Sequence, residues 1–236
     1  METLSAKKLE IQQRETRILA AARPIVVREG YHGLNMDRIA ESVGYSKGTI
    51  YNHFACKEEI IIALAIENMT KRIELFRSAA TFRGCARFRM MAIGEAAEIF
   101  VRKYADYFQF EQILRLDSIR EKTSEKRQAV IQSCELQCMS VVAGLVRDAI
   151  ANGDLNLTSN LTPEELVFGL WSLTSGAYAL ALSSDSLPQL GIADAFATVR
   201  QHTAALLDGH RWQPLSDQFD PEQVLHKIRS EVFSHV

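Results

Sequence analysis

Residues 30–59 read GYHGLNMDRIAESVGYSKGTIYNHFACKEE, and this stretch decides the fold. Apolar residues recur at intervals of three and four on both sides of Gly44, which predicts two short helices. Asn35 precedes the first helix and Ser46 the second, and both side chains can accept a free amide hydrogen at a helix N-terminus. Gly44 suits the tight exit from the first helix. The pattern predicts a helix-turn-helix over about residues 36–54.

The second predicted helix has a buried side and an exposed side. Ile50 and Phe54 are expected to pack against the first helix. The other side chains then point outward, and such a helix can enter the major groove of DNA with its N-terminal residues facing the base edges. The outward residues are Lys47, Gly48, Thr49, Tyr51, Asn52 and His53.

The stretch resembles the signature of the TetR/AcrR family of transcriptional regulators. The shared pattern is an aromatic-Gly turn, a capped helix with Ile-Ala, then Gly-x-Ser-x-Gly-x-x-Tyr-x-His-Phe and Lys-Glu. In that family the residues at positions 46–49 would approach bases and nearby phosphates. Tyr51, His53 and Lys57 would contact the phosphate backbone. The DNA contacts implied by the resemblance are Asn35, Ser46, Lys47, Gly48, Thr49, Tyr51, His53 and Lys57. Cys56 departs from the family, which commonly has Ser or Asp there to cap the next helix.

Gly44, Ser46 and Gly48 also fit the G-x-S-x-G pattern of a hydrolase nucleophile elbow. That interpretation needs a strand before the serine and a helix after it. A helical pattern precedes Ser46 and no parallel strands are indicated, so we expect no enzyme and no catalytic residue. The six histidines show no metal-ligand spacing, so no metal site or cofactor is expected.

Charge is distributed unevenly along the 236 residues. The formal net charge is −2, yet residues 1–57 hold nine Lys and Arg against six Asp and Glu. This local excess of positive charge suits DNA, whose backbone is anionic. The polar N-terminus lacks a secretory signal, and we expect no membrane span, so the predicted location is the cytoplasm. Four cysteines without a C-x-x-C pair fit reduced thiols.

Helical periodicity continues through the rest of the chain, and strand patterns are almost absent. A first helix should end near Gly30, with a kink at Pro24. A fourth helix is expected from about Lys57 to Arg77. Later helices are expected at about 86–103, 105–118, 124–151, 163–183, 191–209 and 221–234. The prediction is an all-α fold: an N-terminal three-helix DNA-binding domain (1–57) followed by a C-terminal ligand-binding and dimerisation bundle (58–236).

The predicted helix at 163–183 is apolar nearly all round, so it must be covered on more than one side. In the TetR/AcrR family two late helices pair with their copies in a four-helix dimer interface. The helices at about 163–183 and 191–209 would fill those places. A homodimer also suits DNA, because two recognition helices must reach major grooves roughly 34 Å apart or a multiple of that distance.

Aromatic and methionine side chains of the C-terminal bundle are candidates for an effector pocket, although such side chains are more often ordinary core. They are Met91, Tyr104, Tyr107, Phe108, Met139, Trp171 and Tyr178. The resemblance implies a repressor that binds palindromic operator DNA and is released by a small, apolar or amphipathic ligand. The alternative is a helical interaction scaffold that keeps the fold without specific DNA binding.

Overall fold

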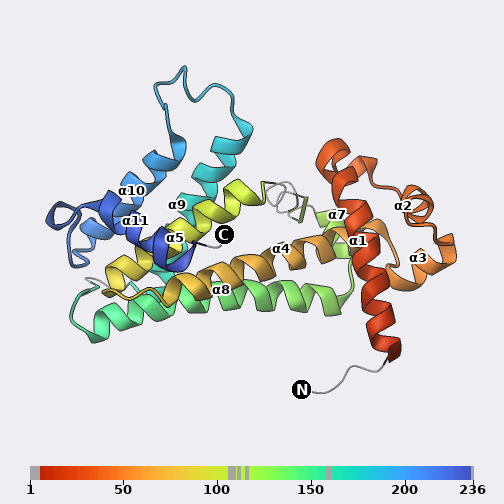
Figure 1. Ribbon diagram of the computed structural model, residues 1–236, viewed down its shortest axis with the longest axis horizontal. Coiled ribbons are helices and arrows are strands. Elements are labelled where there is room, and N and C mark those ends of the chain that lie inside the picture. Colours follow the sequence, from red (N-terminus) through yellow and green to blue (C-terminus); the bar gives the residue numbers. More distant parts are fainter. Residues whose placement is uncertain (1–5, 106–109, 111–112, 115–116, 158–160, 235–236) are drawn as a thin grey trace. The chain divides into compact units, whose positions relative to one another are not determined.

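The computed structural model describes residues 6–105, 110, 113–114, 117–157 and 161–234, and over this part of the chain every regular element is helical (Figure 1). The all-α prediction is therefore confirmed. The helices are α1 (Ala6–Gly33), α2 (Met36–Val43), α3 (Lys47–His53), α4 (Lys57–Ala80), α5 (Ala86–Lys103), α7 (Asp117–Lys122), α8 (Glu125–Ala151), α9 (Pro163–Ser183), α10 (Ala195–Gly209), the short 3-10 helix η1 (Ser216–Gln218) and α11 (Pro221–Val232).

The chain forms two compact units. The N-terminal unit comprises Met1–Met69 and Asp106–Cys134, and the C-terminal unit comprises Thr70–Ala105 and Glu135–Val236. The N-terminal unit thus contains the predicted DNA-binding domain together with the start of α4 and a later segment of the chain. Helices α4 and α8 each contribute residues to both units.

The first helix bends at a glycine rather than at its proline. Gly30 has φ 68° and ψ −173° inside α1, a backbone conformation that suits a residue without a Cβ. Pro24 lies within helical backbone and is exposed, as is Ala20 one turn before it. Water can therefore satisfy the Ala20 carbonyl to which Pro24 donates no hydrogen bond. The kink predicted at Pro24 is replaced by the break at Gly30.

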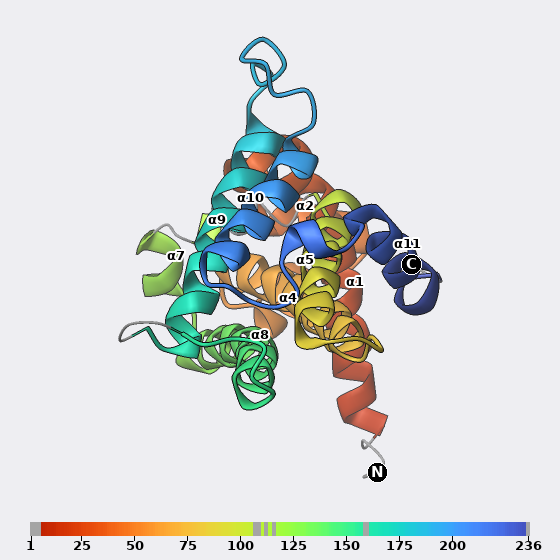
Figure 2. The same cartoon turned by 90° about the vertical axis from the view of Figure 1, so that its left-hand side faces the viewer.

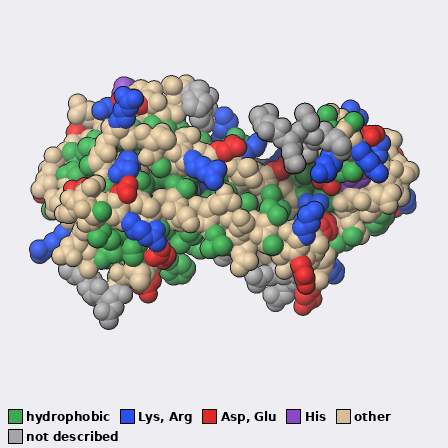
Figure 3. All heavy atoms as spheres, turned by 90° about the horizontal axis from the view of Figure 1, so that it is seen from below, with side chains coloured by type: hydrophobic (Ala, Val, Ile, Leu, Met, Phe, Trp, Pro, Cys, Tyr) green, Lys and Arg blue, Asp and Glu red, His purple; other side chains and the backbone are tan. Residues whose placement is uncertain are grey.

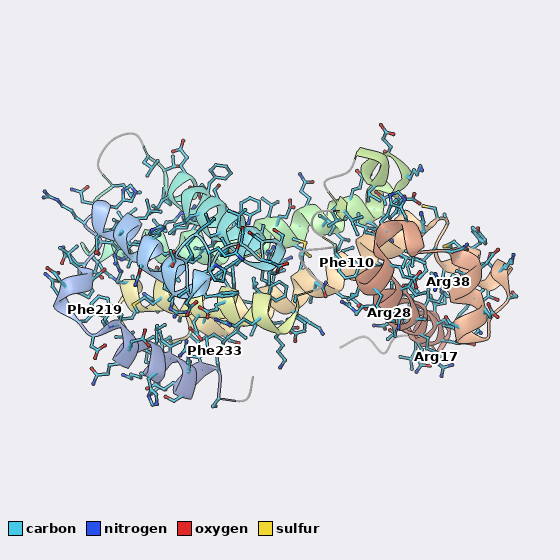
Figure 4. The ribbon with its side chains drawn as sticks, turned by 90° about the horizontal axis from the view of Figure 1, so that it is seen from above. Arg17, Arg28, Arg38, Phe110, Phe219 and Phe233 are labelled. Atoms are coloured by element: carbon cyan, nitrogen blue, oxygen red, sulfur yellow. The ribbon has the colours of Figure 1, made fainter. Side chains whose placement is uncertain are left out.

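One apolar cluster holds the N-terminal unit together. Helices α1 to α4 supply most of it, and Phe110 joins from the later segment of this unit (Figure 4). The fully buried members include Ile18, Ala22, Val26, Ile39, Ile50, Phe54, Ile60, Ile61 and Leu64. Burying each large side chain contributes roughly 1.5–3 kcal/mol. This packing holds the short α2 and α3, which are too short to be stable alone.

In the C-terminal unit, α9 and α10 run side by side, and α5 lies between that pair and α11 (Figure 2). Trp212, Leu225 and Ile228 are buried in its core, so the C-terminal helix packs on the bundle. Helix α10 begins at Ala195 rather than near 191. Asp194 explains the difference, because its carboxylate accepts hydrogen bonds from the first amides of the helix.

Two helices are long and apolar, although no membrane span is expected from the sequence. By length and composition alone, α8 and α9 could each cross a membrane, although core helices pass the same test. Residues 166–183 carry no charged side chain, but Ser172, Thr174 and Ser175 interrupt the apolar run. Only 22% of the most apolar window of α9 is buried within the chain, so much of this helix is left uncovered by its own bundle.

Candidate nucleic-acid interface and ligand cavity

Three local caps fix the start of α2 and the turn between α2 and α3. The Asn35 side chain accepts from the Asp37 amide at 2.8 Å. Gly44 has φ 70° and ψ 28°, the left-handed conformation expected there. Ser46 Oγ accepts from the Thr49 amide at 3.1 Å. These contacts confirm the predicted caps and fix where α3 starts.

The exposed side of α3 carries most of the predicted DNA contacts. Lys47, Gly48, Tyr51 and Asn52 are exposed, and Thr49 is half-buried. The Ser46 and Thr49 hydroxyl oxygens are 2.8 Å apart, so these two side chains orient each other. The helix therefore presents a lysine, a hydroxyl pair and a phenol along one face, groups that can bind base edges and phosphates.

Lys47 has a partner that sequence reasoning missed. Its Nζ lies 2.6 Å from Asp37 Oδ2, and both side chains are exposed. The carboxylate raises the pKa of Lys47, mainly through this hydrogen bond. The pair links the first turn of α2 to the first turn of α3, so Asp37 limits where the Lys47 ammonium can point.

His53 is placed differently from the prediction. Its side chain is only 8% exposed, and Nδ1 lies 3.7 Å from Glu15 Oε1 on α1. It therefore faces α1 rather than pointing outward with Tyr51. The spacing along α3 could not reveal this, because the covering residue comes from another helix.

Lys57 at the start of α4 is held by an aromatic ring. Its Nζ lies 4.0 Å from the centre of the Tyr31 ring and donates to the Tyr31 carbonyl at 3.3 Å. The Tyr31 hydroxyl in turn donates to buried Glu58 at 2.5 Å, and Lys122 pairs with the same carboxylate at 3.5 Å. Cys56 donates its thiol hydrogen to the Lys122 carbonyl at 3.3 Å. This network fixes Lys57 near the end of α1.

Three arginines add positive charge to the N-terminal unit (Figure 4). Arg17 donates to the Tyr45 hydroxyl at 3.3 Å, Arg38 pairs with Glu29 at 2.6 Å, and Arg28 is exposed. None of them was predicted as a DNA contact. On the face drawn in Figure 3, Lys and Arg side chains are interspersed with Asp and Glu side chains. This face therefore has no continuous basic surface among the described residues.

The C-terminal unit contains a cavity of about 470 Å³. Helices α5, α9, α10 and α11 line it, with Phe219 (labelled in Figure 4) after η1. Its volume lies within the roughly 300–1,000 Å³ of small-molecule sites. Among the predicted ligand contacts, Met91 and Tyr178 line this cavity.

The other predicted ligand contacts lie elsewhere. Tyr104 lines a different cavity of about 350 Å³. Met139 packs against the apolar core, and Trp171 is exposed. Tyr107 and Phe108 lie outside the described residues. The structure therefore brings Met91 and Tyr178 together at the larger cavity, whereas Trp171, on the same helix as Tyr178, is exposed instead.

Ion pairs surround the larger cavity. Arg87 lies 2.8 Å from Asp208, Arg200 lies 2.5 Å from Glu98, and Arg229 lies 2.7 Å from Glu95. The Arg87 side chain is 1% exposed. A buried charge is tolerated only with a partner, so these pairs are required by the packing of α5 against α10 and α11.

Helix α9 exposes large apolar side chains within this chain. Phe168 is 58% exposed and Leu180 is 61% exposed, and Trp171 and Leu182 are also exposed. A group of exposed large apolar residues on one helix is typical of a protein interface.

Comparison with known proteins adds a family and a fold. Residues 18–64 match the model of bacterial regulatory proteins of the tetR family. HTH-type transcriptional regulator UidR of Escherichia coli (strain K12) is 40% identical over 68 residues, which are 29% of this chain and 35% of UidR. The match therefore spans about a third of the length of this curated relative.

Two solved structures share the fold over most of the chain. The transcriptional regulator FadR from Bacillus subtilis, in complex with stearoyl-CoA, has a TM-score of 0.60 and 19% identity, and the match covers 82% of this chain and 98% of FadR. A protein from Saccharomonospora viridis in complex with choline has a TM-score of 0.65 and 19% identity, with 84% and 96% covered. At these identities the likeness concerns the fold alone.

Proposed function

Because its N-terminal residues make this chain a member of the tetR family of bacterial regulatory proteins, we propose that it is a dimeric cytoplasmic repressor. It binds palindromic operator DNA and is released by a small apolar or amphipathic ligand. Its relatives regulate transcription rather than catalyse reactions, and the chain is not an enzyme. The observation that carries the proposal is the exposed face of α3, whose first turn is fixed by the Ser46 cap.

The contacts on this face divide into two roles. Lys47 and Thr49 lie in the first turn of α3, where a recognition helix meets base edges. Tyr51 and Lys57 lie where they would bind phosphates, the Asn35 side chain could also donate to a phosphate, and Gly48 allows close approach of the backbone. His53, turned toward Glu15, would act by holding α3 on α1 unless it reorients on DNA.

The proposed dimer is supported by the uncovered face of α9. Trp171 and Leu180 are both exposed on α9, and α10 packs beside this helix. A second copy of the chain would bury these side chains and supply the second recognition helix that a palindromic site requires.

A ligand in the C-terminal cavity would release DNA by favouring a form of the dimer whose recognition helices do not match the operator. It can shift that balance only through its different affinities for the two forms. FadR binds stearoyl-CoA and the S. viridis protein binds choline, so proteins of this fold accept ligands of opposite charge.

The test begins with genome-wide capture of bound DNA, followed by titration of the enriched sequence. We expect the enriched sequence to be a palindrome. Affinity should fall steeply as the salt concentration rises, because Lys and Arg side chains displace counterions from the DNA phosphates. Lys57→Ala should weaken binding, whereas Lys227→Ala on α11 serves as the matched control. A reporter gene should be more active when the regulator is deleted. Absence of any enriched motif would instead support the scaffold alternative.

The dimer is tested separately by sedimentation. Leu180→Glu should yield a monomer that no longer binds the palindrome. Leu136→Glu is the matched control, because Leu136 on α8 is exposed to a similar degree. A wild-type chain that sediments as a monomer at micromolar concentration would contradict the proposal.

A further inference from the structure

We propose that the 470 Å³ cavity binds an uncharged amphiphile that carries a hydrogen-bond acceptor, with Arg87 and Tyr178 as its polar contacts. The inference rests on the proposed function only in treating this cavity as the effector site. It goes further by naming the chemical class of the ligand.

Two arginines and three acids line the described part of the cavity wall. Arg87 and Arg200 are the cationic side chains that line the cavity within the described residues, and each is already paired with a carboxylate. Among the lining acids, Asp208 and Glu95 are paired in the same way, and Glu222 is exposed to solvent. The wall therefore presents no uncompensated positive charge to a bound molecule.

This wall disfavours ions of either sign. A carboxylate or phosphate would enter an apolar cavity without a free cation. A quaternary ammonium would need an uncommitted acid or several aromatic faces. Asp208 and Glu95 are committed to arginines, Glu222 is exposed to solvent that screens its charge, and the face of Tyr178 packs against Phe196 with ring centres 5.3 Å apart. An uncharged molecule meets neither penalty.

The Arg87 side chain contains a hydrogen-bond donor that lacks an acceptor among the described residues. Arg87 Nε is buried and forms no hydrogen bond to the described residues. Its Nη atoms are occupied by Asp208, Ser216 and the carbonyls of Trp212 and Ala204. A buried N–H without an acceptor destabilises the protein, and a ligand oxygen that reached Nε by a small shift of the Arg87 side chain would remove that penalty.

Tyr178 supplies a second donor at the same wall. Burial and the nearby Glu98 carboxylate raise the pKa of its hydroxyl, which therefore stays protonated. Methionines and alanines form much of the remaining wall, which suits an aliphatic chain. An ester, ketone or amide on such a chain would match both donors.

The experiment uses the full chain and three probes with one alkyl chain: methyl decanoate, decanoate and decyltrimethylammonium. Binding is measured by isothermal titration calorimetry below the concentration at which micelles form. We expect the ester to bind about tenfold or more tightly than either ion, a difference of about 1.4 kcal/mol. Tighter binding of decanoate or of the ammonium would overturn the inference.

Two variants test the residues. Tyr178→Phe should weaken ester binding about five- to tenfold, whereas Tyr104→Phe, at the other cavity, should leave it unchanged. Asp208→Asn frees the Arg87 charge and should improve decanoate binding about tenfold. If Asp208→Asn does not fold, Glu98→Gln frees Arg200 in the same way. Unchanged ester binding in Tyr178→Phe, or no binding of any probe to any variant, would overturn the assignment.

Operator binding of each protein is measured alongside. Wild type that binds the palindrome but prefers an ion refutes this inference and leaves the proposed function standing. Wild type that binds no specific DNA refutes the proposed function, whatever the probes do.

Discussion

The two units of the chain position their functional side chains over very different sequence distances. In the N-terminal unit the caps and the ion pair of α2 and α3 join near neighbours: Asn35 with Asp37, Ser46 with Thr49, and Asp37 with Lys47. Around the cavity of the C-terminal unit the ion pairs join residues 102 to 134 positions apart. One site is built by local hydrogen bonds, and the other exists only when the bundle is packed.

This difference has energetic consequences. The Lys47–Asp37 pair is exposed, and such pairs contribute about 0–1 kcal/mol. The Arg87–Asp208 pair is nearly inaccessible on the arginine side, and removing one partner leaves a charge and several carbonyls without their contacts. Substitutions at the DNA-binding face should therefore change recognition, whereas substitutions around the cavity should change folding.

The largest expected effect comes from Arg87. Arg87→Met should lower the free energy of unfolding by about 3–5 kcal/mol, because Asp208 is left unpaired. Lys47→Met should lower it by less than about 1 kcal/mol. Urea denaturation measures both. Adding Asp208→Asn to Arg87→Met should recover part of the loss, and equal effects of the two single changes would remove the proposed difference between the units.

The second-largest expected effect is on the binding of DNA by α3 and the start of α4. Lys47→Ala or Thr49→Ala should reduce the preference for the operator over a mismatched site by about 1–3 kcal/mol. Lys57→Ala should weaken binding to all sequences and lower the salt slope by about 0.9. Titration of matched and mismatched duplexes at several salt concentrations separates the two outcomes. If Lys57→Ala altered sequence preference instead, the assignment of phosphate and base contacts would be reversed.

The same contrast explains what could be predicted from sequence. Caps and helix periodicity depend on neighbouring residues, so the positions of Asn35, Gly44 and Ser46 were predicted correctly. The direction of the His53 side chain was predicted wrongly, because the residue that it faces, Glu15, lies on another helix. The cavity was predicted only through Met91 and Tyr178. Arg87 gave no signal, because an isolated arginine in a helical pattern is normally solvated and its partner lies 121 residues away.

A smaller effect tests the caps themselves. Asn35→Ala and Ser46→Ala should each lower the free energy of unfolding by about 1 kcal/mol, because each leaves a helix amide without its acceptor. Asn52→Ala, on the exposed side of α3, is the control and should have little effect on stability. Unfolding curves in urea give the comparison. Equal effects at all three positions would show that the caps do not determine where α2 and α3 begin.

The smallest effect tests whether a contact between near neighbours behaves alike in both units, because local caps also exist in the C-terminal unit. At the start of α9, Glu165 accepts from the Thr162 amide at 2.7 Å, and the Glu165 amide donates to Thr162 Oγ1 at 3.2 Å. The hydrogen bond from the Thr162 backbone is the main reason why the pKa of Glu165 lies below its ordinary value of 4.5. A carboxylate with a lowered pKa in the folded state contributes stability above the unfolded pKa, and this is lost as the pH falls through the folded pKa.

Stability measured by thermal unfolding should therefore decline slightly as the pH drops below about 4.5, and Glu165→Gln should remove that part of the decline. Glu164→Gln leaves the Thr162–Glu165 contacts intact and should retain it. Both variants must be compared at the same ionic strength, because Glu164 pairs with Arg147 at the surface. If the two variants behave alike, the cap at α9 does not act as the caps at α2 and α3 do. The contrast would then lie between the units themselves rather than between local and long-range contacts.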